Sequence, residues 1–168
     1  AETKQAIASL SEVGATPNLP FRSFPQSTDD VYQYMSGFDW SLPWGAGGQT
    51  ASLAVFLATQ APIFLPETCV GELQNTMCNF YRSIADSKSG GYFRGRTPEH
   101  GLLVNGAMKV LTALDWLNEQ IHYPEQLIDT TLHQPPRPDG CHLVDAIYVL
   151  YRCALQCDYK KMAIESYL

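Results

Sequence analysis

The stretch Gly90–Leu117, GGYFRGRTPEHGLLVNGAMKVLTALDWL, decides the fold of this chain. It opens with a glycine-rich turn that carries two aromatic residues. Thr97-Pro98-Glu99 follows as a helix start, with threonine as the expected cap and proline in the first turn. Apolar residues then recur on nearly every side of the helix. Such a helix must be covered all round, so we expect it to be buried.

Two other stretches repeat this arrangement, PWGAGGQTASLAVFL (residues 43–57) and PDGCHLVDAIYVLYRCAL (residues 138–155). Each joins a Gly/Pro-rich turn to an apolar run with little polar surface. In the first stretch we expect regular structure to begin only at Thr50, because Pro43 and three glycines precede it. Between the apolar helices, spacings of three and four residues predict one-sided amphipathic helices over Glu2–Val13, Ser27–Asp39, Glu67–Asp86 and Tyr123–Leu132.

Half-buried helices that alternate with fully apolar ones are typical of stacked αα-hairpins. No segment shows the period-two alternation of a strand. The sequence therefore predicts a single all-α domain over residues 1–168. Its outer helices would face water, and its inner helices would pack against a central core.

Composition excludes several classes of function. The net charge is −6 and the basic residues are scattered, so no patch is suited to binding nucleic acid. The five cysteines form no CxxC pair, which favours reduced core cysteines in a cytoplasmic protein. No signal peptide opens the chain, and no apolar run approaches the roughly 20 residues that span a bilayer. We expect no membrane span.

GGYFRG (residues 90–95) followed by TPEHGLLVNGAMKVLTAL (residues 97–114) resembles one repeat of the α/α toroid. This fold occurs in terpenoid cyclases, protein prenyltransferase β subunits and many carbohydrate-active enzymes, where such a turn precedes an inner helix whose N-terminus faces the central cavity. The resemblance implies a half-toroid, a fragment of a larger ring, or a chain that closes by association. It carries over no catalytic residue, because neither the DxDD run of the cyclases nor the zinc ligands of the prenyltransferases can be matched.

If the inner helices share a cavity, the polar residues of their first turns converge there. We predict an acid–base group of Glu99, His100, His142 and Asp145. His142 and Asp145 lie three residues apart, so the carboxylate could orient the imidazole, or both could simply satisfy a buried helix start. Glu99 suits a helix N-terminus without any catalytic role. The candidate ligand-binding residues are Trp40, Trp44, Gln49, Tyr92, Arg94 and Asn105. The three aromatic residues and Arg94 lie on or beside the turns.

Three functions are consistent with this pattern. The first is an enzyme that binds a carbohydrate-like ligand at the inner-helix N-termini and cleaves it by acid–base hydrolysis or elimination. The second is a non-catalytic helical scaffold that associates with itself or with a larger chain. The third is isoprenoid binding or cyclisation. We expect no cofactor and no metal, since Cys141, His142, Asp145 and Cys157 lack a recognised ligand spacing.

Overall fold

The computed structural model describes residues 2–135, 137 and 140–167. Within these ranges the chain forms helices and no strand, and an isolated antiparallel bridge joins Ala85 to Tyr92. The predicted all-α class is therefore confirmed. The α-helices are α1 (Glu2–Glu12), α2 (Thr28–Ser36), α3 (Pro43–Thr59), α4 (Glu67–Ile84), α5 (His100–Trp116), α6 (Pro124–Leu132), α7 (His142–Ala154) and α8 (Lys161–Tyr167), and a 3-10 turn, η1 (Ala61–Ile63), follows α3.

Several helix ends follow the local rules of the sequence. The Ser27 hydroxyl caps α2 by accepting a hydrogen bond of 3.1 Å from the backbone N–H of Asp30. Pro124 occupies the first turn of α6, where its missing N–H costs nothing. Beyond the end of α1, Gly14 adopts a left-handed backbone with φ of 70°, as expected of a residue that stops a helix.

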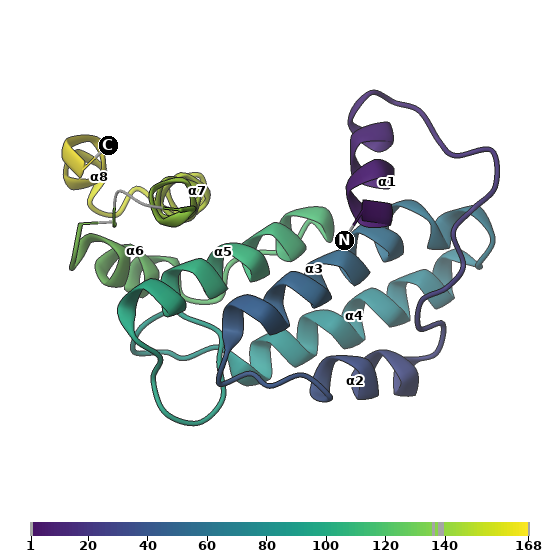
Figure 1. The fold of residues 1–168 in the computed structure, drawn as a ribbon, viewed down its shortest axis with the longest axis horizontal. Coiled ribbons are helices and arrows are strands. Elements are labelled where there is room, and N and C mark those ends of the chain that lie inside the picture. The colour runs from purple at the N-terminus through teal and green to yellow at the C-terminus, as the bar shows by residue number, and fades with distance from the viewer. Residues whose placement is uncertain (1, 136, 138–139, 168) are drawn as a thin grey trace.

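The centre of the fold is the contact between α3 and α5, which run side by side in the same direction (Figure 1). Two glycines allow the close approach. A Cβ atom on Gly47 would lie 2.8 Å from Cβ of Lys109, and one on Gly106 would lie 2.7 Å from Cβ of Pro43. The expectation that regular structure begins at Thr50 is therefore wrong. Packing against α5 stabilises helical backbone through glycines that on their own disfavour it.

The remaining N-terminal helices surround this pair. Figure 1 shows α4 beside α3, α2 against α4, and α1 crossing α3 on the opposite side. The largest fully buried side chains in this part of the core include Met35 of α2, Trp40 after α2, and Met77 and Tyr81 of α4. These helices are amphipathic, as their spacing predicts. The α1 and α4 helices pack on α3, and α2 packs on α4.

On the other side of α5, α7 packs against α5 and α6, and α8 contacts α6. In Figure 1, α7 is seen nearly end-on whereas α5 lies across the view, so these two helices cross steeply. The expectation that α7 is covered all round is wrong, because its neighbours cover one side only. The sequence pattern also did not predict α8. Five large apolar residues of α7 and its C-terminal end are exposed: Leu143, Val144, Ile147, Tyr151 and Leu155.

All five cysteines are free. Cys78 and Cys153 are buried, and burial raises the pKa of each thiol to about 12. These two pack as small apolar side chains, as expected of core cysteines. Cys69 and Cys141 are exposed, and Cys157 is half-buried.

Among the described residues, no helix combines the length and the apolar character that a bilayer crossing needs.

Candidate functional site

The start of α5 is built differently from the expectation. The helix begins at His100, and its cap is Glu99 instead of Thr97. The Glu99 carboxylate accepts hydrogen bonds from the backbone N–H groups of Leu102 at 2.8 Å and Gly101 at 3.2 Å. The hydrogen bond from Leu102 is the largest cause of a lowered pKa of the Glu99 carboxyl, which favours its ionised form.

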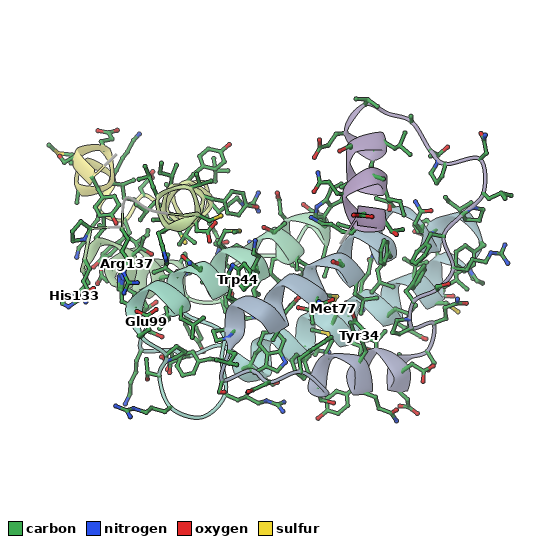
Figure 2. The ribbon with its side chains drawn as sticks, in the orientation of Figure 1. Tyr34, Trp44, Met77, Glu99, His133 and Arg137 are labelled. Carbon is green, nitrogen blue, oxygen red and sulfur yellow. The ribbon has the colours of Figure 1, made fainter. Side chains whose placement is uncertain are left out.

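A pocket of about 50 Å³ lies between the first turns of α5 and α7. Glu99, His100 and Asn105 line it from α5, and His142 lines it from α7. Figure 2 shows Glu99 beside Arg137, whose guanidinium Nη2 is 4.0 Å from Oε2 of the carboxylate. Four of the residues singled out in the sequence therefore share one pocket, and their roles stay predictions.

His142 is held against α5 by Asn105. The amide nitrogen of Asn105 lies 3.0 Å from Nδ1 of His142. An amide N–H can only donate, so Nδ1 accepts and the proton of a neutral ring sits on Nε2. The ring fits here because residue 101 is glycine. A Cβ atom on Gly101 would lie 3.2 Å from Cε1 of His142.

His100 has the opposite arrangement. Its Nε2 is 2.8 Å from the carbonyl oxygen of Thr130 in α6. A carbonyl can only accept, so Nε2 carries a proton and Nδ1 is the acceptor of the neutral ring. The two histidines of the pocket therefore offer complementary groups, a donor on His142 and an acceptor on His100.

Asp145 lies outside this pocket. Its side chain is buried at 2% exposure, and Nδ1 of His142 faces Asn105 instead of the carboxylate. Burial raises the pKa of the Asp145 carboxyl, and the nearby charges of Lys109 and His142 only partly oppose this. Its Oδ2 atom has no hydrogen-bond partner among the described residues. The predicted pairing of His142 with Asp145 is thus not formed in this arrangement.

Two of the predicted ligand-binding aromatics belong to the core. Trp40 is 2% exposed, and its indole N–H donates to the carbonyl of Met35 at 2.8 Å. Tyr92 is 1% exposed, and its hydroxyl accepts a hydrogen bond of 3.3 Å from the backbone N–H of His122. Both residues are part of the hydrophobic core, with their polar atoms hydrogen-bonded.

Asn105 lines the pocket, whereas three further predicted ligand-binding residues are exposed and lie away from it. Trp44 is in the first turn of α3, with the Lys109 ammonium 5.6 Å from its ring centroid, and Figure 2 shows it well apart from Glu99. Gln49 is exposed on the same helix. The Arg94 guanidinium lies 5.0 Å from the centroid of the Phe80 ring. None of these side chains lines the pocket between α5 and α7.

A second hollow, of about 390 Å³, adjoins the first and shares His100 and Gln134 with it. Its walls include Ser89 and Thr97 beside α5, and Asp129 and His133 from α6 and its C-terminal end. Sequence reasoning missed the contributions of Gln134, Arg137 and Tyr167 to the pocket. The pattern of the segment 133–140 indicates only a turn, although its position immediately before α7 would have placed polar residues near the cavity.

Within the described ranges, no group of three or more His, Cys, Asp or Glu side chains is arranged to hold a metal ion.

Comparisons of the chain with protein-family models, with curated proteins and with solved structures found no match.

Proposed function

We propose that this chain binds a carbohydrate-like ligand in the two adjoining hollows at the starts of α5 and α7. The observation that carries the proposal is the meeting of Glu99, His100, Asn105 and His142 in one pocket. They come from two helices and two distant parts of the sequence, and only the packing of α7 on α5 brings them together.

The sizes of the hollows define what would fit. The pocket of about 50 Å³ is several times the volume of about 10–15 Å³ that one ordered water needs, so it accommodates a carboxyl or hydroxymethyl end group but no sugar ring. The adjoining hollow of about 390 Å³ lies in the usual range for small-molecule sites, roughly 300–1,000 Å³. A ring in the larger hollow with its end group in the smaller one satisfies both.

The polar groups support a ligand that both donates and accepts hydrogen bonds. Nε2–H of His142 and the guanidinium of Arg137 donate, whereas Nδ1 of His100 and the ionised Glu99 accept. Sugars and sugar acids carry both kinds of group. Acid–base cleavage by hydrolysis or elimination would use Nδ1 of His100 as the proton acceptor. Nε2–H of the neutral His142 ring would donate a hydrogen bond to the leaving oxygen, and water would supply the proton that the leaving group takes up.

The packing of the inner helices supports the toroid part of the proposal. In an α/α toroid the inner helices follow one another around a ring, and α3 packs on α5 as α5 packs on α7. The parallel run of α3 and α5 suits this arrangement. The steep crossing of α7 departs from it, so we propose an open, irregular set of hairpins.

The isoprenoid hypothesis has less support than the saccharide hypothesis. It requires an apolar cavity lined by turn aromatics, and Trp40 and Tyr92 are instead enclosed in the core with their polar atoms hydrogen-bonded.

Binding is tested by following the histidine side chains in ¹⁵N–¹H correlation spectra while glucose or glucuronate is added. We expect glucuronate to shift the signals of His100 and His142. The Asn105→Ala variant should weaken the response because it frees the His142 ring. Gln49→Ala, which removes another amide outside the pocket, is the matched control. Unshifted signals for both histidines at high millimolar concentrations of both sugars would contradict the proposal.

Catalysis is tested separately, by turnover on a panel of polysaccharides that includes polyuronates. His100→Ala and His142→Ala should each abolish cleavage while circular dichroism shows an unchanged helix content. Activity that survives both substitutions would remove these residues from the mechanism without affecting the binding result.

A further inference from the structure

The exposed side of α7 carries a continuous apolar ridge. Leu143, Ile147, Tyr151 and Leu155 follow one another at intervals of four residues, and Val144 lies beside the first of them. Their exposed fractions run from 38% at Ile147 to 67% at Val144. Residues four apart are neighbours on a helix surface, so these side chains form one strip. A strip of this kind on a surface marks an interaction site.

We infer that this ridge is the contact surface of a homodimer, in which α7 of one copy packs against α7 of a second copy. The inference goes beyond ligand binding in the pocket and is independent of it. It gives a partner and a surface to the association hypothesis drawn from the sequence.

The absence of charge on the ridge permits a second copy as its occupant. The chain has a net charge of −6, so two copies repel each other wherever their charged surfaces meet. The ridge avoids this repulsion, because the charged residues of α7 are turned elsewhere. Asp145 is buried, and Arg152 forms an ion pair with Asp115 of α5. A charged partner would find no complementary group on this strip.

The ridge is also self-complementary about a two-fold axis. When two copies of α7 meet in opposite directions with the axis between Ile147 and Tyr151, each Ile147 faces the Tyr151 of the other copy. The same operation places Leu143 opposite Leu155. Both kinds of pair then join apolar side chains, and the two copies use the same patch, as in an isologous interface. Ridges of four-residue spacing pack into each other at about −50°, the commonest helix crossing.

The area suits a reversible dimer. With about 150–200 Å² for a fully exposed large side chain, the five exposed fractions amount to roughly 400–550 Å² in each copy. Two copies then bury at most roughly 800–1,100 Å² through these residues, below the range of about 1,200–2,000 Å² of stable interfaces. We expect dissociation at about micromolar concentration, near 8 kcal/mol of binding free energy.

The test is sedimentation velocity of the wild-type chain and of single variants over a micromolar concentration series. Ile147→Glu and Tyr151→Lys each place a charge against an apolar residue of the second copy, and each should weaken the dimer at least about tenfold. Mixing the two variants should restore association, because the carboxylate introduced in one chain then meets the ammonium group introduced in the other. Ile63→Glu, at an exposed site of similar burial on η1, is the matched control and should dimerise like the wild type.

Circular dichroism and thermal melting show whether each variant is folded. Residue 147 is partly solvated in the monomer, so a folded Ile147→Glu chain is expected. The inference is overturned if the wild-type chain stays monomeric at about 100 times the expected micromolar dissociation constant. A dimer that Ile147→Glu leaves intact overturns it as well, since another surface would then form the interface. Failure of the mixed variants to associate excludes the antiparallel register.

Discussion

Gly106 is the position where the packing of α3 against α5 can be tested most sharply. In Gly106→Ala the new Cβ atom would lie 2.7 Å from Cβ and 2.8 Å from Cγ of Pro43, and 3.0 Å from its carbonyl carbon. The proline ring is rigid and cannot rotate away, so the helices must separate. Overpacking of this kind costs about 1–3 kcal/mol.

The helix preference of alanine over glycine works in the opposite direction and returns about 1 kcal/mol. Because the contact involves three atoms of a rigid residue, we expect the upper part of the overpacking range and a net loss of about 1–2 kcal/mol. For a chain of this length the loss lowers Tm by roughly 2–8 °C.

Gly48→Ala is the matched control, because nothing lies within 4 Å of its added Cβ atom. It gains the helix preference without a clash, so Tm should rise by roughly 2–4 °C. The assay is thermal unfolding followed by circular dichroism at 222 nm, with urea titration as a second measure of the free energy of unfolding. If Gly106→Ala raised Tm as Gly48→Ala does, the close approach of α3 and α5 would be refuted.

Three further predictions concern polar groups. Glu99→Gln should lower stability at pH 7 by about 0.5 kcal/mol through loss of charge at the N-terminus of α5. The folded pKa of the Glu99 carboxyl is depressed, so the stability that its charge contributes is present above the unfolded pKa and is lost as pH falls through the folded pKa. Melting curves at pH 7 and pH 3 should show that the difference in Tm between wild type and variant shrinks in acid. Asp145→Asn should stabilise the chain at pH 8, because a raised folded pKa means that deprotonation of the carboxyl costs stability as pH rises above the unfolded pKa. Urea unfolding should show that this gain disappears near pH 3. A variant less stable than the wild type at pH 8 would count against a buried carboxylate whose Oδ2 lacks a hydrogen-bond partner among the described residues. Tyr81→Phe removes the hydrogen bond of 2.8 Å to Oγ1 of Thr50 and should cost about 0.5–1.5 kcal/mol in urea unfolding, with no loss expected in a Thr50→Val background.

Much of the helical architecture could be predicted from the sequence because its determinants are local. The spacing of apolar residues indicated α1, α4 and α6, and the cap at Ser27 indicated α2. The apolar length of α5 predicted its burial, and Leu103 and Leu114 are indeed 3% and 0% exposed. Each of these features depends on residues within one or two turns of each other.

The candidate site could be predicted only in part. We expected polar residues at the starts of α5 and α7 to lie together, and Glu99, His100 and His142 do line one pocket. Sequence spacing suggested that Asp145 would orient His142, but spacing along one helix does not include the neighbouring helix. Asn105 of α5 occupies that role, and Asp145 is buried between the helices.

The sequence by itself therefore determined which segments of Gly90–Leu117 and its two counterparts are helical and apolar, because propensity, caps and periodicity act over a few residues. Tertiary structure decided which of those apolar faces are covered. The α3 helix extends back through Gly47 because α5 lies against it, and the outer face of α7 stays open because no described helix reaches it. Burial depends on what lies on the other side of a helix, and that is settled only when distant segments pack.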